Sequence, residues 1–181
     1  HVERISRDWS RTARRLEEEF EVSVGFVNGK RCLGGMLELL SHCHYLVAVD
    51  DARLGFPEVT LPVVPGMEGC HWPFRKAGAA HWPKLLAALL GGTPVKAADA
   101  VGWLADFAGP LDAALAVTWK IAGGGDHGLK RRVVEKSALV GAEICDKEDY
   151  HVDLPTQSGR APAAREGRRK GAKAAFGVGT Y

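Results

Sequence analysis

The sequence has no excess of either charge and no long apolar run. Its 181 residues contain 24 Lys and Arg against 22 Asp and Glu, so the formal net charge is only +2. A charge this small produces no global attraction to nucleic acid or to an acidic membrane surface. Charged residues, His or Gly interrupt the apolar stretches well short of the roughly 20 residues that a membrane span needs. We therefore expect no nucleic-acid partner and no membrane partner.

Cysteine is scarce and poorly spaced for binding a metal. The four cysteines form no CxxC pair and match no common zinc pattern. The chain opens on the charged stretch HVER, with no apolar core of a secretory signal behind it. The expectation is a cytoplasmic protein with reduced thiols and no metal site.

Helix-like and strand-like segments alternate along the first 122 residues. Apolar residues recur at three- and four-residue steps over residues 3–20, which predicts an amphipathic helix. Strands are predicted at residues 21–27 and 46–49, an extended segment at 54–59, and helices at 36–45, 79–90, 94–103, 110–122 and 129–145. A further helix is predicted to begin near Pro65-Gly66. This alternation indicates an α/β architecture with parallel strand pairing.

Two glycines precede the helix predicted at residues 36–45, where residues 33–39 read LGGMLEL. Glycine lets the backbone come close to a ligand, and an N–H at a helix start can stabilise a developing oxyanion. Glu38 falls in the first turn of this helix, close to that N–H. A tight turn followed by a helix-stabilising glutamate explains the same pattern without any catalysis.

A second carboxylate, Glu58, follows twenty residues later in LGFPEV at residues 54–59. A carboxylate in an apolar stretch is costly to bury unless it is satisfied or used. Two carboxyl groups brought together have separated pKa values, so one serves as acid and the other as base. An ordinary surface glutamate is the alternative. The segment PVVPGMEG at residues 62–69 offers another glycine N–H, that of Gly66, at a predicted helix start.

Together these segments resemble the enoyl-CoA hydratase/isomerase, or crotonase, family. The resemblance rests on VNG at residues 27–29, LGGMLEL at 33–39, FPEV at 56–59, Pro65-Gly66, and GGTPVKAADAVGWL at 91–104. The spacing between the two glutamates agrees with that of the family without a gap. The resemblance covers about residues 20–122 and implies a crotonase-like α/β fold, built of ββα units with a parallel sheet and helices.

The resemblance implies roles for four residues. Gly35 matches the glycine whose N–H is one of two oxyanion-hole donors for a thioester carbonyl. Glu38 and Glu58 match the two catalytic glutamates, which hold a water and move its proton during addition across a 2,3 double bond. Gly66 matches a glycine at the N-terminus of a helix beside the site. Coenzyme A is then part of the acyl-CoA substrate, and no separate cofactor is implied.

Three residues depart from the family pattern near the site. Met36 replaces the third glycine and is expected to narrow the pocket beside the oxyanion hole, Glu68 adds a third carboxylate, and Trp72 adds bulk. There is also one extra residue between Gly29 and Leu33. These departures favour an unusual acyl group or a divergent reaction.

The family's amino-terminal segment, which carries the other oxyanion donor and most of the coenzyme A pocket, has no match in this sequence. Residues 1–122 are therefore interpreted as the carboxy-terminal part of an incomplete crotonase core. Residues 123–181 are interpreted as a carboxy-terminal helical region with a basic tail. A partner polypeptide that supplies the missing half is expected to cover exposed sheet edges and apolar surface, and the family implies a trimer-based oligomer.

The functional expectation is hydration of a 2-enoyl-CoA, or the reverse dehydration. Isomerisation of an enoyl-CoA, hydrolysis of an acyl-CoA on the same site, and a non-catalytic structural subunit remain alternatives. The histidines in SHCH at residues 41–44 are not expected to share a metal, because residues two apart on a helix point in different directions. His71 is better placed for a functional role, close to Glu68 and to the expected site.

Overall fold

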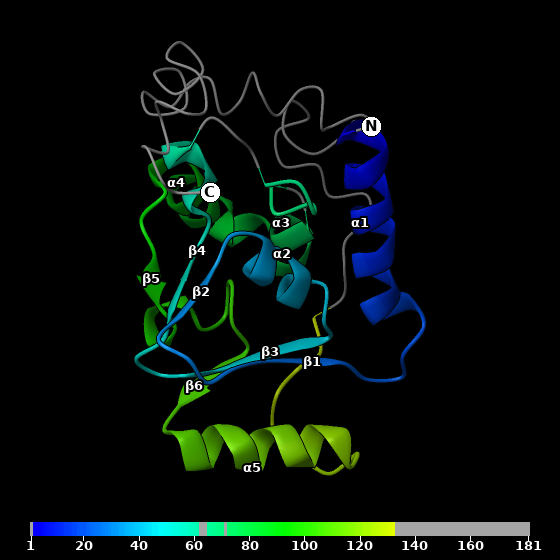
Figure 1. Cartoon of the computed structure of the whole chain (residues 1–181). Helices are drawn as coiled ribbons and strands as arrows, with labels where there is room; N and C mark the ends of the chain where they lie inside the picture. The colour runs from blue at the N-terminus through cyan, green and yellow to red at the C-terminus, as the bar shows by residue number, and fades with distance from the viewer. Residues whose placement is uncertain (1, 62–64, 71, 133–181) are drawn as a thin grey trace.

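The computed structural model describes residues 2–61, 65–70 and 72–132 (Figure 1). Its elements are α1 (Val2–Glu18), β1 (Val24–Val27), β2 (Arg31–Leu33), α2 (Gly35–Ser41), β3 (Tyr45–Val49), β4 (Arg53–Gly55), η1 (Pro57–Thr60), α3 (Trp72–Ala77), η2 (Ala79–His81), α4 (Trp82–Gly91), β5 (Val95–Lys96), η3 (Ala98–Ala100), β6 (Phe107–Gly109) and α5 (Leu111–Ala122). Within these ranges no helix combines the length and the apolar character needed to cross a membrane.

The strands form two small sheets. In the first, β1 and β6 lie on either side of β3 and both pair with it in parallel. In the second, β2 and β4 pair in parallel, and β5 joins β4 antiparallel. Figure 1 shows α5 on one face of the first sheet and α2 and α3 on the other. The predicted α/β architecture with parallel pairing is confirmed.

Strand β3 is the centre of the fold because all five of its residues are buried. Successive side chains of a strand point to opposite faces of its sheet. Tyr45 and Val47 pack against Ala114 and Ile121 of α5, whereas the alternate residues of β3 join the main core. That core is a single cluster of buried apolar side chains, including Leu37, Leu46, Ala48, Leu54, Phe56, Phe74, Leu85 and Trp103.

The parallel pair β2–β4 positions the candidate site. Leu33 at the end of β2 pairs with Gly55 at the end of β4, and the Gly34 N–H donates to the Gly55 carbonyl over 2.9 Å. The carboxyl ends of parallel strands meet at one edge of a sheet. The first turn of α2, with Glu38, and the short helix η1, with Glu58, therefore begin side by side.

Most predicted helices are present, but two predicted boundaries are wrong and one predicted helix is absent. The helix expected at 36–45 ends at Ser41, because Tyr45 already belongs to β3. The helix expected at 94–103 is replaced by β5 and η3, because Val95 and Lys96 pair with β4. No helix begins at Gly66, which lies in a bend before α3.

In the carboxy-terminal part of the described chain, two further helix predictions are confirmed and one is wrong at its start. The helix predicted at 79–90 appears as α4, which Gly92 ends in the left-handed conformation at φ 65°, and the helix predicted at 110–122 appears as α5. Residues 129–132 are not helical. The rest of the helix predicted at 129–145, and the basic tail, lie outside the described residues.

Two helices expose apolar side chains. In α1, Ser10 and Ala13 are buried, but Ile5 and Trp9 of the predicted apolar face are exposed. In α5 the exposed apolar residues are Leu111, Leu115 and Trp119, spaced four residues apart along one stripe, with Trp119 75% exposed. A stripe of this kind on a soluble domain marks an interaction surface more often than a free face.

Candidate active site

Glu38 is a buried carboxylate held by backbone amides. Its side chain is 2% exposed, and its Oε2 accepts hydrogen bonds from the N–H groups of Met67 at 2.7 Å and Gly69 at 2.8 Å. The Gly66 N–H also acts on this carboxylate. The segment before α3 therefore folds over the first turn of α2 and directs its amides at one side chain.

The environment of Glu38 suits proton transfer near neutral pH. Burial raises its pKa to about 7, the Gly69, Met67 and Gly66 amides oppose that rise, and the nearby charge of Glu58 adds to it. A group that titrates close to the working pH exchanges protons most effectively as a general acid or base.

Glu58 lies beside Glu38 but has a different environment. It is 8% exposed, and burial raises its pKa. Its carboxylate packs against the backbone of Gly34, where a Cβ would lie 2.7 Å from Oε1. Within the described residues, no group donates a hydrogen bond to Oε2 of Glu58. A buried polar atom without a protein partner is unusual, and a bound water or substrate would satisfy it.

Gly35 and its neighbour begin α2 at the same edge. Gly34 adopts φ 57°, ψ −135°, a conformation that side chains disfavour. Gly35 is the first helical residue, so its N–H has no partner within the helix. An amide in this position can bind an anion at the positive end of a helix. The sequence interpretation singled out Gly35 and missed the role of Gly34 in making room for Glu58.

Gly66 is not at the start of a helix, although the sequence analysis predicted it there. Helix α3 begins at Trp72, so Gly66 is not at a helix N-terminus, and its N–H acts on Glu38. The structure thus brings Glu38, Glu58 and Gly35 to one edge and makes Gly66 part of the backbone that surrounds Glu38.

The third carboxylate, Glu68, is the centre of a buried ionic cluster. It is 1% exposed, and it accepts hydrogen bonds from Arg14 of α1 and from Nε2 of His42 at 3.0 Å. Trp72 stacks on His42 with ring centroids 4.7 Å apart and lies under Arg14. Burial alone would raise the pKa of Glu68, but the hydrogen bonds from His42 and Arg14 lower it to about 2.

Glu68 also has a backbone conformation that is rare for a side-chain-bearing residue. Its φ is 70°, which costs a non-glycine residue about 1–3 kcal/mol. The bonds that the Glu68 carboxylate makes with Arg14 and His42 offset this conformational cost. Arg14 and His42 were not identified from the sequence, because they lie far from Glu68 along the chain.

Met36, which the sequence analysis expected to narrow the pocket, is 58% exposed, so its side chain extends into solvent.

The two histidines of the SHCH segment bind different partners. His42 contacts Glu68, whereas His44 accepts from the Ser23 N–H at 2.9 Å and bonds the Glu17 carbonyl at 3.1 Å. Across the described ranges, no three His, Cys, Asp or Glu side chains are grouped as metal ligands. Both histidines lie in the turn that follows α2. His71 lies outside the described residues.

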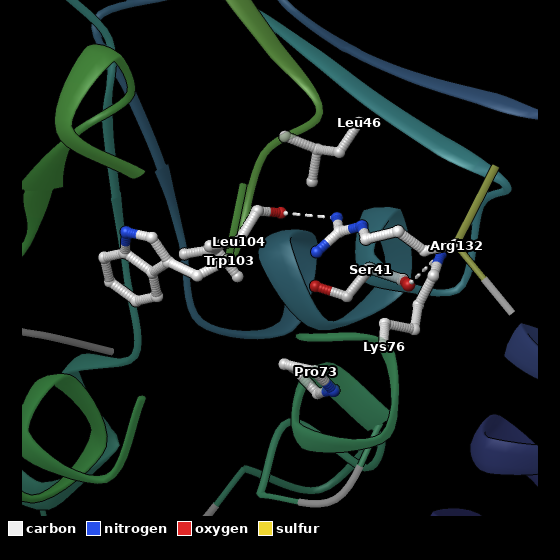
Figure 2. A pocket seen from close by; sticks show the side chains of 7 residues that line it. All are labelled: Ser41, Leu46, Pro73, Lys76, Trp103, Leu104 and Arg132. Carbon is white, nitrogen blue, oxygen red and sulfur yellow. Dashed lines mark hydrogen bonds between the residues drawn. The ribbon is translucent and has the colours of Figure 1, made fainter. Parts of the chain in front are cut away.

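A small cavity lies away from the glutamates (Figure 2). Its lining residues are Ser41, Leu46, Pro73, Lys76, Trp103, Leu104 and Arg132. The buried Lys76 donates to the carbonyls of Ser41 and Cys43, and burial lowers its pKa to about 8. Arg132 pairs with Asp106. The Lys76 bonds join α3 to the end of α2 and the turn after it, and the Arg132 pair joins the segment after α5 to the residue before β6, which is a structural role.

The chain is similar to known enzymes over part of its length. It is 39% identical over 87 residues to a probable enoyl-CoA hydratase of Bacillus subtilis, a match that spans 48% of this chain and 32% of that protein. It is 42% identical over 69 residues to the peroxisomal bifunctional enzyme of Cavia porcellus, across 38% of this chain and 9% of that protein. No family model matches the chain.

Solved structures show the same fold. An enoyl-CoA hydratase of Geobacillus kaustophilus superposes with a TM-score of 0.60 at 22% identity, over 67% of this chain and 45% of that one. A carnitinyl-CoA dehydratase of Mycobacterium thermoresistibile superposes with a TM-score of 0.55 at 25% identity, over 92% and 51%. The chain thus spans about half the length of these relatives or less. Over the part that matches, the chain is similar to enoyl-CoA hydratases, and it has the crotonase fold of the solved structures.

Proposed function

We propose that this chain carries the two catalytic glutamates of a site that hydrates a 2-enoyl-CoA, or dehydrates the corresponding 3-hydroxyacyl-CoA. The observation that carries the proposal is the pairing of Glu38 and Glu58. Both are buried, both have raised pKa values, and the charge of one acts on the other. Paired carboxyl groups with unequal environments supply an acid and a base in one site.

The environments suggest which glutamate has which role. Amide donors stabilise the carboxylate form of Glu38, which suits a base that takes a proton from water as the water oxygen bonds to C3. Glu58 lacks a described donor at Oε2, which favours its protonated form and suits an acid that delivers a proton to C2. The addition leaves Glu38 protonated and Glu58 ionised, and proton exchange with solvent restores the pair.

Between these two proton transfers, negative charge develops on the thioester oxygen. The Gly35 N–H, at the start of α2, is the described donor best placed to stabilise it, in a family whose members bind acyl-CoA thioesters. One such donor contributes about 3 kcal/mol to transition-state stabilisation. Coenzyme A is part of the substrate in this scheme, and the chain's own residues supply the acid, the base and the oxyanion donor without a separate cofactor.

A partner polypeptide and a trimer-based assembly are part of the proposal. The support is the exposed apolar surface, namely Ile5 and Trp9 of α1 and the stripe Leu111, Leu115 and Trp119 of α5. Surfaces of this kind are costly to leave in water. We propose that another polypeptide covers them and completes the oxyanion hole.

The test is a hydration assay on the full chain, alone and with any polypeptide that co-purifies with it. Crotonyl-CoA should lose the ultraviolet absorbance of its conjugated thioester, and mass spectrometry should identify 3-hydroxybutyryl-CoA. Sedimentation of the same samples reports the assembly. Loss of the conjugated absorbance with no change in mass would support isomerisation instead, because the double bond then moves out of conjugation without gain of water. Release of free coenzyme A would support hydrolysis. An active monomer of this chain alone would refute the need for a partner.

A further inference from the structure

Glu68 lies between the two residues whose backbones bind Glu38. The N–H groups of Met67 and Gly69 donate to the same carboxylate oxygen of Glu38, at 2.7 and 2.8 Å. The side chain of Glu68 bonds Arg14 and His42 instead. One three-residue segment therefore contacts Glu38 through its backbone and contacts α1 and the turn after α2 through its side chain.

The backbone at Glu68 needs those side-chain contacts. Its φ of 70° lies in the left-handed region that residues with a Cβ rarely adopt. Nε of Arg14 lies 3.0 Å from both carboxylate oxygens, Nη2 makes a further bond, and Nε2 of His42 lies 3.0 Å from Oε2. These bonds hold the residue in a conformation that its own backbone disfavours.

His42 connects the cluster to Glu38 a second time. Its Nδ1 lies 2.8 Å from the carbonyl oxygen of Glu38, and its Nε2 faces Glu68. A carbonyl and a carboxylate both accept hydrogen bonds, so each ring nitrogen of His42 faces an acceptor. The same cluster thus bonds the main chain of Glu38 and orients the amides on its side chain.

We propose that Glu68 is a positioning residue, whose ion pairs with Arg14 and His42 fix residues 67–69 so that two backbone amides hold Glu38 as the water-activating carboxylate. The inference rests on the proposed function for what Glu38 does. The coupling between Glu68 and Glu38 needs no substrate, so it can be measured without one.

The experiment follows the titration of Glu38 by carbon-detected NMR in the full chain labelled at glutamate carboxyl groups. The charged groups around Glu38 are Glu58, Glu68, His42 and Arg14. Glu68→Gly removes the carboxylate and its bonds to Arg14 and His42, and glycine does not hold the segment at φ 70°, because it populates positive and negative φ about equally. Once the bonds from Glu68 to Arg14 and His42 are lost, the Met67 and Gly69 amides should bond the Glu38 carboxylate less well. These amides lower the pKa of Glu38, so its titration midpoint should rise by about one pH unit.

Two further variants make the result specific. Glu19→Gln is the matched control, because Glu19 forms an exposed ion pair with Arg15 on α1, and it should leave the Glu38 midpoint unchanged. Arg14→Gln weakens the cluster from α1, where the Arg14 side chain is 42% exposed, and should shift the midpoint in the same direction as Glu68→Gly. Hydration by Glu68→Gly should fall roughly tenfold or more, and the acid limb of its pH profile should move with the midpoint.

The outcomes separate this inference from the proposed function. A midpoint that moves in a chain that does not hydrate crotonyl-CoA supports the positioning role and refutes the proposed function. A midpoint that stays fixed in folded Glu68→Gly, or in folded Arg14→Gln if the first variant does not fold, overturns the inference whatever the activity. Thermal unfolding identifies the folded variants, and a purely structural Glu68 would lower their melting temperature without moving the midpoint.

Discussion

Gly69 and Glu38 are in direct contact, with the Gly69 N–H 2.8 Å from Oε2 of Glu38. A Cβ at position 69 would lie 2.8 Å from Cγ of Glu38 and 2.8 Å from Cβ of Pro65. Real side chains do not approach so closely, so the glycine allows the backbone to reach the carboxylate.

Gly69→Ala should therefore lower hydration activity more than it lowers folding stability. The added methyl group must displace Glu38 or the Pro65 segment, and loss of one amide contact should slow hydration by about tenfold to a hundredfold. Steady-state kinetics and thermal unfolding measure the two effects. Gly29→Ala is the control, because a Cβ there meets nothing within 4 Å. Equal losses of activity in the two variants would contradict the prediction.

The two glutamates distinguish hydration from isomerisation. Glu38→Gln and Glu58→Gln preserve shape and remove the titrating group, and in a hydratase each should lower turnover by about two to four powers of ten. The double variant should be little worse than the poorer single one, because the pair acts as a unit. In an isomerase only one substitution should be that severe. If neither matters, the non-catalytic alternative is favoured.

The proposed oxyanion donor, the Gly35 N–H, should be removable with little effect on folding. Gly35 is the first residue of α2, a position where proline is well accepted. Gly35→Pro deletes the N–H and should reduce kcat about a hundredfold or more, with helical content preserved by circular dichroism. Gly35→Ala keeps the N–H and places its Cβ 3.1 Å from the flexible end of Met67, so it should retain most activity. Similar rates for the two variants would show that the oxyanion hole lies elsewhere.

Burial of Glu38 should make folding stability depend on pH. Its pKa is about 7 in the folded chain, against an ordinary value of 4.5, so the folded state binds the proton more tightly. Its contribution to stability is therefore complete below about pH 4.5 and is lost as the pH rises through 7. Relative to Glu38→Gln, the wild type should lose up to about 3 kcal/mol between pH 5 and pH 8.

Urea unfolding at unit pH steps measures this difference. Glu58→Gln should change stability with the same sign, because burial also raises the pKa of Glu58. Glu68→Gln should change the pH dependence of folding stability with the opposite sign. The pKa of Glu68 is lowered to about 2, so its contribution is present above about pH 4.5 and is lost as the pH falls through 2. A wild-type and Glu38→Gln difference that stays constant from pH 5 to pH 8 would contradict the prediction.

The sequence was sufficient for the elements that carry the glutamates. The Gly34-Gly35 pair indicated the start of α2, and the resemblance to the crotonase family, with its matching spacing of Glu38 and Glu58, implied that the two glutamates share a site. The segment at 94–103 was misread as a helix because its alanines favour one. Pairing of Val95 and Lys96 with β4 overrides that local preference, as tertiary contacts often do.

The ionic cluster was beyond sequence reasoning for a physical reason. Arg14 lies 54 residues from Glu68, and His42 lies 26 residues from it. Neither distance follows a helix or strand period, so no local pattern joins the three residues. Glu68 itself was noticed as a departure from the family pattern. The structure shows a glycine-like backbone conformation at Glu68 and bonds from its side chain to Arg14 and His42.

The parallel register of β2 and β4 determines where this chain tolerates changes in length. The turn at residues 28–30 is exposed, and a side chain at Gly29 would meet nothing. The extra residue between Gly29 and Leu33 therefore falls in or next to a turn that absorbs it before β2 begins. An insertion within β2 or β4 has no such outlet, because these strands pair residue by residue. It would shift one glutamate relative to the other, so natural variation in length should gather in exposed turns, such as residues 28–30 and Asp50-Asp51, and be absent from the two strands.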